Sequence, residues 1–226
     1  MLAGTFARAH NCFISATLVG EQYPAPSRGL YYFAMPEFKT AVLIDGGFLR
    51  VAAKKKFDPD FIEAFAHACK SPDETVFRVL YYDCAMYSGT VKLPVSGASH
   101  TFTSSDAWLH ALSHKDLFAV RRGVLKFRGF RPKRTPVASA TLTDADFEPI
   151  FEQKGVDMRI GLDIAAYSDN HAVDRIILVS GDTDCVPALK YGRRAGLQVV
   201  LIQPANQKLA PELFAHADFR RTVVLP

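Results

Sequence analysis

The sequence of 226 residues lacks long apolar runs, paired cysteines and a large excess of charge of either sign. No stretch approaches the roughly 20 consecutive apolar residues of a membrane-spanning helix, so the sequence predicts no membrane partner. The four cysteines stand far apart without a C-x-x-C pair, which disfavours a disulfide framework and a zinc site and favours a reducing, cytoplasmic location. With 49% hydrophobic and 22% charged residues, the composition is that of a globular domain.

The first 34 residues show no clear periodicity. They lack the charged start and unbroken apolar run of a secretory signal, and they contain two prolines and six aromatic residues. A regular pattern begins only after them. We therefore interpret residues 1–37 as an N-terminal extension of unknown role and residues 38–226 as one domain.

The small net charge of +4 conceals one strongly basic segment, residues 121–134. This basic segment holds seven basic residues and no acidic one, and the rest of the chain has 20 basic residues against 23 acidic ones. A local excess of this kind favours a polyanionic partner more than the overall charge does. A solvated edge strand is the alternative, because basic side chains also protect exposed strands from aggregation.

Short apolar runs alternate with helix-like stretches from residue 40 onward. Strands are expected over residues 40–45, 75–82, 117–130 with a break at Gly123, 175–180, 197–202 and 222–225. Helices are expected over residues 58–70, around 105–112, and over 144–154, 157–167, 184–195 and 209–215. Strands that are apolar on both faces and alternate with helices predict an α/β fold, with a mainly parallel sheet covered by helices on both sides. Ligands of such sheets bind at the carboxyl ends of the strands, where the strand order reverses.

Aspartates follow the two most regular strands at those ends. Asp45 follows the first strand, and Asp182 and Asp184 follow the strand over residues 175–180. Carboxylates gathered at one sheet edge repel one another unless a cation joins them. Because hard oxygen ligands select such ions, we expect a Mg²⁺ or Mn²⁺ site here.

The helix over residues 157–167 carries two further aspartates. Six residues at 100° each place Asp157 and Asp163 about 120° apart around the helix axis, so they cannot share one face. The helix is apolar nearly all round, which predicts that it is buried and that Asp163 has a cationic or hydrogen-bonding partner. We expect Asp157, at the helix start, to point into the metal site, so the predicted ligands are Asp45, Asp157, Asp182 and Asp184.

Each aspartate also has an ordinary structural interpretation. Asp45 could form a turn, Asp157 and Asp184 could cap helices, and Asp83 could end a strand. Independent caps have no reason to gather at one end of one sheet. Their joint placement therefore favours the metal site.

Four ordered motifs run through the domain. They are A-V-L-I-D-G-G-F at residues 41–48, Y-Y-D at 81–83, K-G-V-D-M-R-I-G-L-D at 154–163 and I-L-V-S-G-D-T-D-C-V-P-A-L at 177–189. In this order and spacing they resemble the NYN domain, the LabA-like branch of the PIN-like nuclease superfamily. The resemblance implies a three-layer α/β/α sandwich, a Mg²⁺ or Mn²⁺ site and action on RNA. Phe48 stands where several relatives in the superfamily carry asparagine.

The resemblance also assigns roles to individual residues. It implies that Asp45, Asp157, Asp182 and Asp184 bind the metal, and it matches Asp163 to a second acid of the branch. The basic segment would then bind the phosphates of single-stranded RNA, with Phe127 and Phe130 stacking on bases. Its basic residues are Arg121, Arg122, Lys126, Arg128, Arg131, Lys133 and Arg134.

Three functions fit these features unequally. A metal-dependent ribonuclease is favoured, and an RNA-binding or regulatory module with weak or no catalysis is the alternative. A phosphotransferase of the haloacid dehalogenase type needs a second aspartate two residues after the first, where this chain has Gly47. The sequence does not distinguish a monomer from a homodimer.

Overall fold

The computed structural model describes residues 37–53, 57–135 and 142–226. All but the last residue of the predicted N-terminal extension lies outside these ranges. The extension and its boundary therefore stay predictions.

The described residues form a seven-stranded sheet in the order β6-β5-β2-β1-β7-β8-β9. Its strands are β1 (Phe38–Asp45), β2 (Glu74–Cys84), β5 (Phe118–Pro132), β6 (Phe147–Lys154), β7 (Arg175–Val179), β8 (Gln198–Pro204) and β9 (Phe219–Val223). All neighbouring strands in this sheet are parallel except β5 and β6. The predicted mainly parallel sheet is confirmed.

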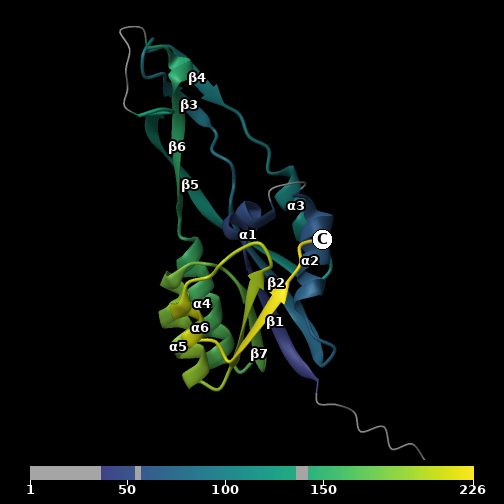
Figure 1. Cartoon of the computed structure of the whole chain (residues 1–226). Coiled ribbons are helices and arrows are strands. Elements are labelled where there is room, and N and C mark those ends of the chain that lie inside the picture. The colour runs from purple at the N-terminus through teal and green to yellow at the C-terminus, as the bar shows by residue number, and fades with distance from the viewer. Residues whose placement is uncertain (1–36, 54–56, 136–141) are drawn as a thin grey trace, which may run out of the picture. The chain divides into compact units, whose positions relative to one another are not determined.

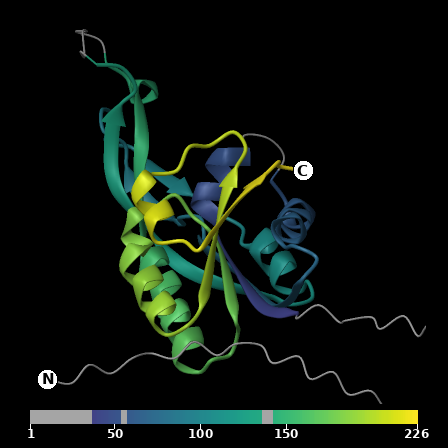
Figure 2. The same cartoon turned by 60° about the horizontal axis from the view of Figure 1, so that its bottom comes forward.

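Helices cover both faces of the sheet (Figures 1 and 2). On one face lie α1 (Gly46–Ala53), α2 (Pro59–Cys69) and α3 (Ala107–Ser113), and on the other lie α4 (Val156–Asp169), α5 (Val186–Arg194) and α6 (Pro211–Ala215). Successive residues of β1 point to opposite faces, so Leu43 packs with α4 and α5 while Ile44 packs with α1 and α2. The result is the three-layer α/β/α sandwich that the sequence predicts.

Helix boundaries follow local signals where these are strong. The Asp58 carboxylate accepts a hydrogen bond from the Phe61 amide at 2.9 Å, and Pro59 occupies the first turn of α2. After α5, Gly196 has a φ of +97°, a left-handed conformation that favours glycine. Two short 3₁₀ helices, η1 (Asp144–Asp146) and η2 (Thr183–Cys185), complete the helical elements of the described residues.

Some sequence-based boundaries were wrong. Residues 144–154 form η1 and strand β6 and not a helix, because β6 pairs antiparallel with β5. The strand over residues 118–132 is unbroken, and Gly123 lies buried within it, where a Cβ would meet the Lys154 carbonyl oxygen at 2.8 Å. The last strand covers residues 219–223 and not 222–225.

Helix α4 is less buried than its composition predicts. Val156, Ile160 and Ile164 face the sheet, whereas Met158 and Leu162 are 72% and 63% exposed. The two exposed residues are four positions apart and therefore lie on the same outer face. The prediction of a helix buried all round was wrong.

An arm extends from the edge of the sheet (Figure 1). Residues 124–132 of β5 leave β2 and pair with β6 alone, and a hairpin of β3 (Gly89–Lys92) and β4 (Ser99–Phe102) packs against this ribbon. Aromatic rings with centroids 5.2–6.2 Å apart form the core of the arm: Tyr87, Phe102, Phe127, Phe130 and Phe151. Phe127 and Phe130 are partly buried by these ring contacts, and their stacking on bases stays a prediction.

A buried ion-pair network holds the amino ends of the strands. Glu74 on β2 is fully buried and lies 2.6 Å from the guanidinium groups of both Arg175 on β7 and Arg221 on β9. Burial acts to raise the pKa of Glu74, but hydrogen bonds from the two arginines outweigh it and lower that pKa to about 2. The network ties three strands together at the end of the sheet opposite the aspartates.

Replacing Glu74 with glutamine is expected to lower the free energy of unfolding by about 3–5 kcal/mol, because the buried Arg175 keeps only the more distant carboxylate of Asp73, at 3.4 Å. Since the folded pKa is lower than the unfolded one, the wild-type contribution is complete above pH 4.5 and is lost as the pH falls toward 2. Urea unfolding between pH 2 and 7 measures both effects. Glu148→Gln removes an exposed pair with Arg131 and should cost less than about 1 kcal/mol.

Candidate functional site

The strand order reverses at β1. The chain passes from β1 to β2 and β5 on one side and then crosses to β7 on the other, so the carboxyl ends of β1 and β7 form a topological switch point. Asp45 ends β1, and Asp182 and Asp184 follow β7. The first turn of α4 brings Asp157 to the same edge.

Asp45 is the most buried of these acids. Its Oδ1 accepts a hydrogen bond from the Phe48 amide at 3.1 Å, and its Oδ2 accepts one from the Ser180 hydroxyl at 3.3 Å. Burial raises the pKa of Asp45, and the negative charge of Asp157 raises it further. Asp45 thus stabilises the start of α1, where the sequence suggested a turn, and also belongs to an electrostatically coupled set.

Asp157 interacts electrostatically with the other three acids. Burial and the negative charges of Asp182 and Asp184 raise its pKa. Burial also raises the pKa of the neighbouring Cys185 thiol to about 12, with added contributions from Asp182, Asp157 and Asp45. The structure therefore gathers the four predicted metal ligands at one edge of the sheet.

Helix capping does not account for this set. Gly155 is the N-cap of α4 and Cys185 that of α5, so neither Asp157 nor Asp184 caps a helix. Asp182 accepts a hydrogen bond from the Asp184 amide at 2.9 Å and caps only the short η2. The capping interpretations of Asp157 and Asp184 were therefore wrong.

The donor chemistry of the four acids fits a hard divalent cation. Within the described residues none of the four forms an ion pair with a basic side chain, and hydrogen bonds from the Phe48 and Gly47 amides and from Ser180 only partly offset the raised pKa of Asp45. In the same ranges, no three His, Cys, Asp or Glu side chains stand close enough together to enclose one ion. Mg²⁺ usually retains several waters and needs only one or two carboxylates, which an open set of this kind provides.

Asp163 lies elsewhere on α4 and has the partners that the sequence predicts. Its carboxylate receives hydrogen bonds from Arg121 at 3.0 and 3.2 Å and from the Tyr82 hydroxyl at 2.9 Å. Through these contacts it connects α4 to β2 and β5. Asp163 therefore positions the helix that carries Asp157, and its charge is offset by Arg121.

Asp83 and Arg50 are site residues whose roles sequence reasoning missed. Asp83 ends β2 beside the acids and is only 1% exposed. It forms an ion pair with Arg50 of α1 and accepts hydrogen bonds from the Tyr81 hydroxyl at 3.0 Å and the Cys84 amide at 2.7 Å. The Y-Y-D motif was the available signal, but the arginine 33 positions away could be paired with it only in three dimensions.

Close packing requires glycine at position 46 and leaves little room at position 47. A Cβ at Gly46 would lie 2.3 Å from the Tyr81 hydroxyl oxygen, and one at Gly47 would lie 3.1 Å from Gln153 Oε1 and 3.3 Å from Asp45 Oδ1. Helix α1 begins directly at Gly46, so the pair forms the first turn of a helix. Gln153, from the arm strand β6, is a further polar group near Asp45 that the sequence did not single out.

The basic segment is not an isolated positive strip. Four of its arginines form ion pairs with carboxylates from other elements: Arg121 with Asp163, Arg122 with Asp106, Arg128 with Glu152 and Arg131 with Glu148. Lys133 donates to the Ala145 carbonyl at 2.7 Å. The segment itself contains no acid, but β6, α4 and Asp106 before α3 bring acids to it from elsewhere in the sequence.

Comparison with known proteins places the chain in a family. The family model for the NYN domain matches residues 39–224, which is most of the sequence. The chain belongs to the NYN domain family. Among solved structures, that of a protein of unknown function from Vibrio parahaemolyticus is similar over 83% of this chain and 93% of that one, with 19% identity and a TM-score of 0.46. No curated protein matches the sequence.

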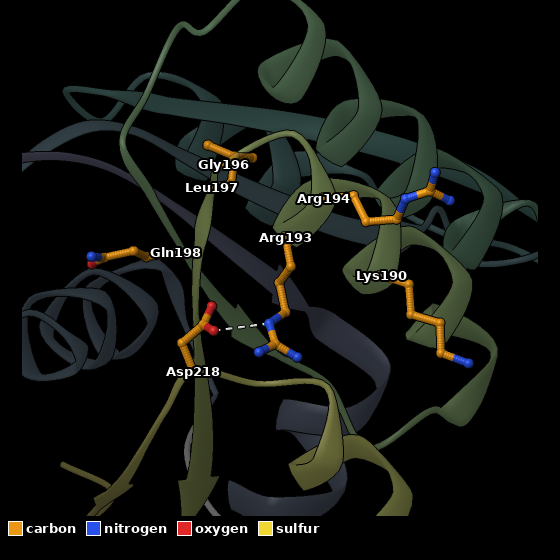
Figure 3. A pocket seen from close by; sticks show the side chains of 7 residues that line it. All are labelled: Lys190, Arg193, Arg194, Gly196, Leu197, Gln198 and Asp218. Carbon is orange, nitrogen blue, oxygen red and sulfur yellow. Dashed lines mark hydrogen bonds and ion pairs between the residues drawn. The ribbon is translucent and has the colours of Figure 1, made fainter. Parts of the chain in front are cut away.

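A second basic surface of the NYN domain lies at the opposite edge of the sheet (Figure 3). A hollow of about 450 Å³ is lined by Lys190, Arg193, Arg194, Gly196, Leu197, Gln198 and Asp218. Arg193 forms an ion pair with Asp218 at 2.8 Å, whereas Lys190 and Arg194 point away from that carboxylate (Figure 3). Arg193 and Arg194 lie in the last turn of α5, where they offset the helix dipole.

The NYN domain has no membrane-crossing helix of sufficient length and apolarity in the ranges that the structure describes. Its three described cysteines, Cys69, Cys84 and Cys185, are free and buried.

Replacing Asp45 with asparagine is expected to raise the melting temperature at neutral pH in EDTA. The pKa of Asp45 is higher in the folded state than in the unfolded state, so ionisation of Asp45 destabilises the fold as the pH rises above 3.8. Asparagine keeps the shape and removes the charge. Thermal unfolding of both proteins from pH 4 to 8 measures the difference.

Asp169→Asn is the matched control, because Asp169 is an exposed acid at the far end of α4. It should change the free energy of unfolding by no more than about 0.5 kcal/mol. An Asp45→Asn protein that melts below wild type at neutral pH would show that the ionised carboxylate stabilises the fold.

Proposed function

We propose that this NYN domain is a metal-dependent ribonuclease that hydrolyses RNA phosphodiester bonds. Mg²⁺ or Mn²⁺ would be held by Asp45, Asp157, Asp182 and Asp184. The observation that supports the proposal is the gathering of these four acids at the switch point with no basic side chain among the described residues to offset them. Family membership supports a nuclease-type fold.

A divalent ion bound there would lower the pKa of an attacking water and stabilise the leaving oxygen. The chain's own residues prepare the site for it. Asp45 and Asp157 carry raised pKa values while no cation is present, so ion binding favours their ionised form. Ser180 and the Phe48 amide orient the Asp45 carboxylate, and the Arg121–Asp163 pair fixes α4 and thereby Asp157.

Single-stranded RNA is the proposed substrate, and the basic segment is its proposed binding surface. Arg128 and Arg131 pair with glutamates on the open face of the arm, and both pairs are largely solvent-exposed. Exposed pairs of this kind contribute only about 0–1 kcal/mol, so phosphates can replace the glutamates at little cost. Assignment to the LabA-like branch and a cytoplasmic location remain predictions.

An RNA-binding or regulatory module with weak or no catalysis is the second candidate. One observation favours it: within the described ranges no three acidic, histidine or cysteine side chains enclose an ion position. Such a module would bind RNA through the basic segment without needing the aspartates. The two candidates therefore differ in what loss of the aspartates does.

Incubation of the protein with end-labelled single-stranded RNA should give cleavage with Mn²⁺ or Mg²⁺ and none with EDTA. Asp45→Asn and Asp182→Asn should each lower kcat/KM by at least about 100-fold, because each removes an ionic ligand. Asp169→Asn should cleave like wild type. Cleavage that persists in EDTA, or in both ligand variants, would exclude the metal-dependent mechanism, and RNA binding without cleavage would favour the regulatory module.

Combined replacement of Arg128, Arg131 and Lys133 by alanine should weaken RNA binding and reduce its salt dependence. Loss of three phosphate contacts to a single strand lowers the slope of log K against log salt by about 2. Fluorescence anisotropy in EDTA between 50 and about 200 mM salt measures the slope without cleavage. The matched control is the triple alanine variant of Lys190, Arg193 and Arg194, which removes three basic residues from the opposite edge of the sheet. Equal loss in both variants would indicate a general effect of net charge.

A further inference from the structure

Arg50 is a cation at the candidate site that lies outside the basic segment. It belongs to α1 and follows Asp45 by five residues. At the carboxyl ends of the strands, the four acids lie toward the face of the sheet that α4 covers. Arg50, Asp83 and Arg122 lie toward the face that α1 and α3 cover. A strand of RNA crossing the edge at the acids would also cross this second side.

Contacts with buried groups of the domain hold the guanidinium of Arg50 in place. Asp83, its ion-pair partner, is almost fully buried and is further held by the Tyr81 hydroxyl and the Cys84 amide. The same guanidinium lies 5.3 Å from the ring centre of Phe57 and 5.9 Å from that of Trp108. These contacts restrict the orientation of Arg50 before any ligand arrives.

Part of the guanidinium remains available. The Arg50 side chain is 45% exposed, and within the described ranges its hydrogen bonds go only to Asp83. A guanidinium has five N–H donors, so others still face solvent. Asp83 accepts further hydrogen bonds from the Tyr81 hydroxyl and the Cys84 amide, so the carboxylate stays in place beneath the guanidinium.

Arg50 lies close to the acids. The Asp83 carboxylate that it binds is 2.8 Å from the position that a Cβ would occupy on Gly46, the residue after Asp45. The Tyr81 hydroxyl experiences the charges of Asp83, Arg50 and Asp45 together. Arg50 and the acids thus lie at the same end of the sheet, joined through Asp83 and Tyr81.

Arg50 differs from the arginines of the arm in how it is held. Arg128 and Arg131 pair with exposed glutamates, and such pairs exchange readily for phosphate. Arg50 is paired with a buried carboxylate whose position is fixed by the fold, so the Arg50 side chain keeps its position when RNA binds. The arm arginines therefore suit adaptable binding, whereas Arg50 suits a fixed contact.

We propose that Arg50 binds the RNA phosphate next to the scissile one and thereby sets the position at which the strand is cut. This inference rests on the proposed ribonuclease function. It adds a substrate-binding residue on the α1 side of the edge, separate from the acids and from the basic segment. The ligand chemistry is a phosphodiester of a single-stranded polynucleotide.

The test compares Arg50→Ala and Arg50→Lys with wild type on end-labelled single-stranded RNA. In EDTA, where no cleavage occurs, Arg50→Ala should weaken binding about tenfold and lower the salt slope by about 0.7, because one phosphate contact is lost. Arg50→Lys keeps the charge and should restore the slope. With Mn²⁺, Arg50→Lys should still cut at altered positions or at least about tenfold more slowly, because a lysine lacks the planar fork.

Arg220→Ala is the matched control. Arg220 is also an exposed arginine stacked on an aromatic ring, 4.7 Å from the centre of Phe214, but it lies on the edge strand β9. It should leave the cleavage positions unchanged. Melting temperatures of all variants show whether Arg50→Ala, which removes the ion-pair partner of Asp83, unfolds the protein. If it does, the role of Arg50 is judged from Arg50→Lys, which keeps the charge.

The outcomes separate this inference from the proposed function. The role of Arg50 alone would be overturned by three results together. The wild-type protein cleaves RNA, Arg50→Lys has the wild-type rate and cutting positions, and Arg50→Ala binds RNA as tightly as wild type. Wild-type protein that neither binds nor cleaves RNA would overturn both. Reduced binding in Arg50→Ala with an unchanged salt slope would indicate a structural role and would also overturn the proposal.

Discussion

Four aspartate carboxylates share one end of a parallel sheet without a basic side chain among the described residues to offset them. This arrangement is unfavourable by itself, because burial and mutual repulsion raise the pKa values of Asp45 and Asp157. Other buried or half-buried acids of the domain are treated differently. Glu74, Asp83 and Asp163 each have an arginine. The contrast indicates that the four acids at the carboxyl ends of the strands lower the stability of the fold, as the residues of functional sites often do.

The rest of the sheet is built to hold that edge in place. Strand β1 is buried on both faces and hydrogen-bonded on both sides, so Asp45 has little freedom to move. At the opposite end, the Glu74 network ties β2, β7 and β9 together. Helix α4, which carries Asp157, is connected to β2 and β5 through Asp163. The acids are therefore carried by rigid elements, which limits how far they can relax away from one another.

Several site features could be read from residue order, and others could not. Asp45, Asp182 and Asp184 were predictable because the carboxyl ends of parallel strands meet at one edge whatever the rest of the chain does. A partner for Asp163 was predictable because a carboxylate among apolar residues needs one, but its identity as Arg121 depended on β5 passing beside α4. Strand β6 was mistaken for a helix because Phe147, Ile150 and Phe151 also have helical spacing, and only pairing with β5 decides between the two.

The layered α/β architecture, the family and the end of the sheet at which the acids lie could all be predicted from the residues alone, because they depend on local periodicity and on residue order along the strands. How each charge is balanced depends on the folded arrangement. Folding pairs most of the arginines of the basic segment with acids from β6, from α4 and from Asp106 before α3, packs Phe127 against other rings of the arm, and places Arg50 on the buried Asp83. The physical reason is that electrostatic and packing partners are chosen by distance in space, and residues far apart in the sequence become neighbours only when the sheet is assembled.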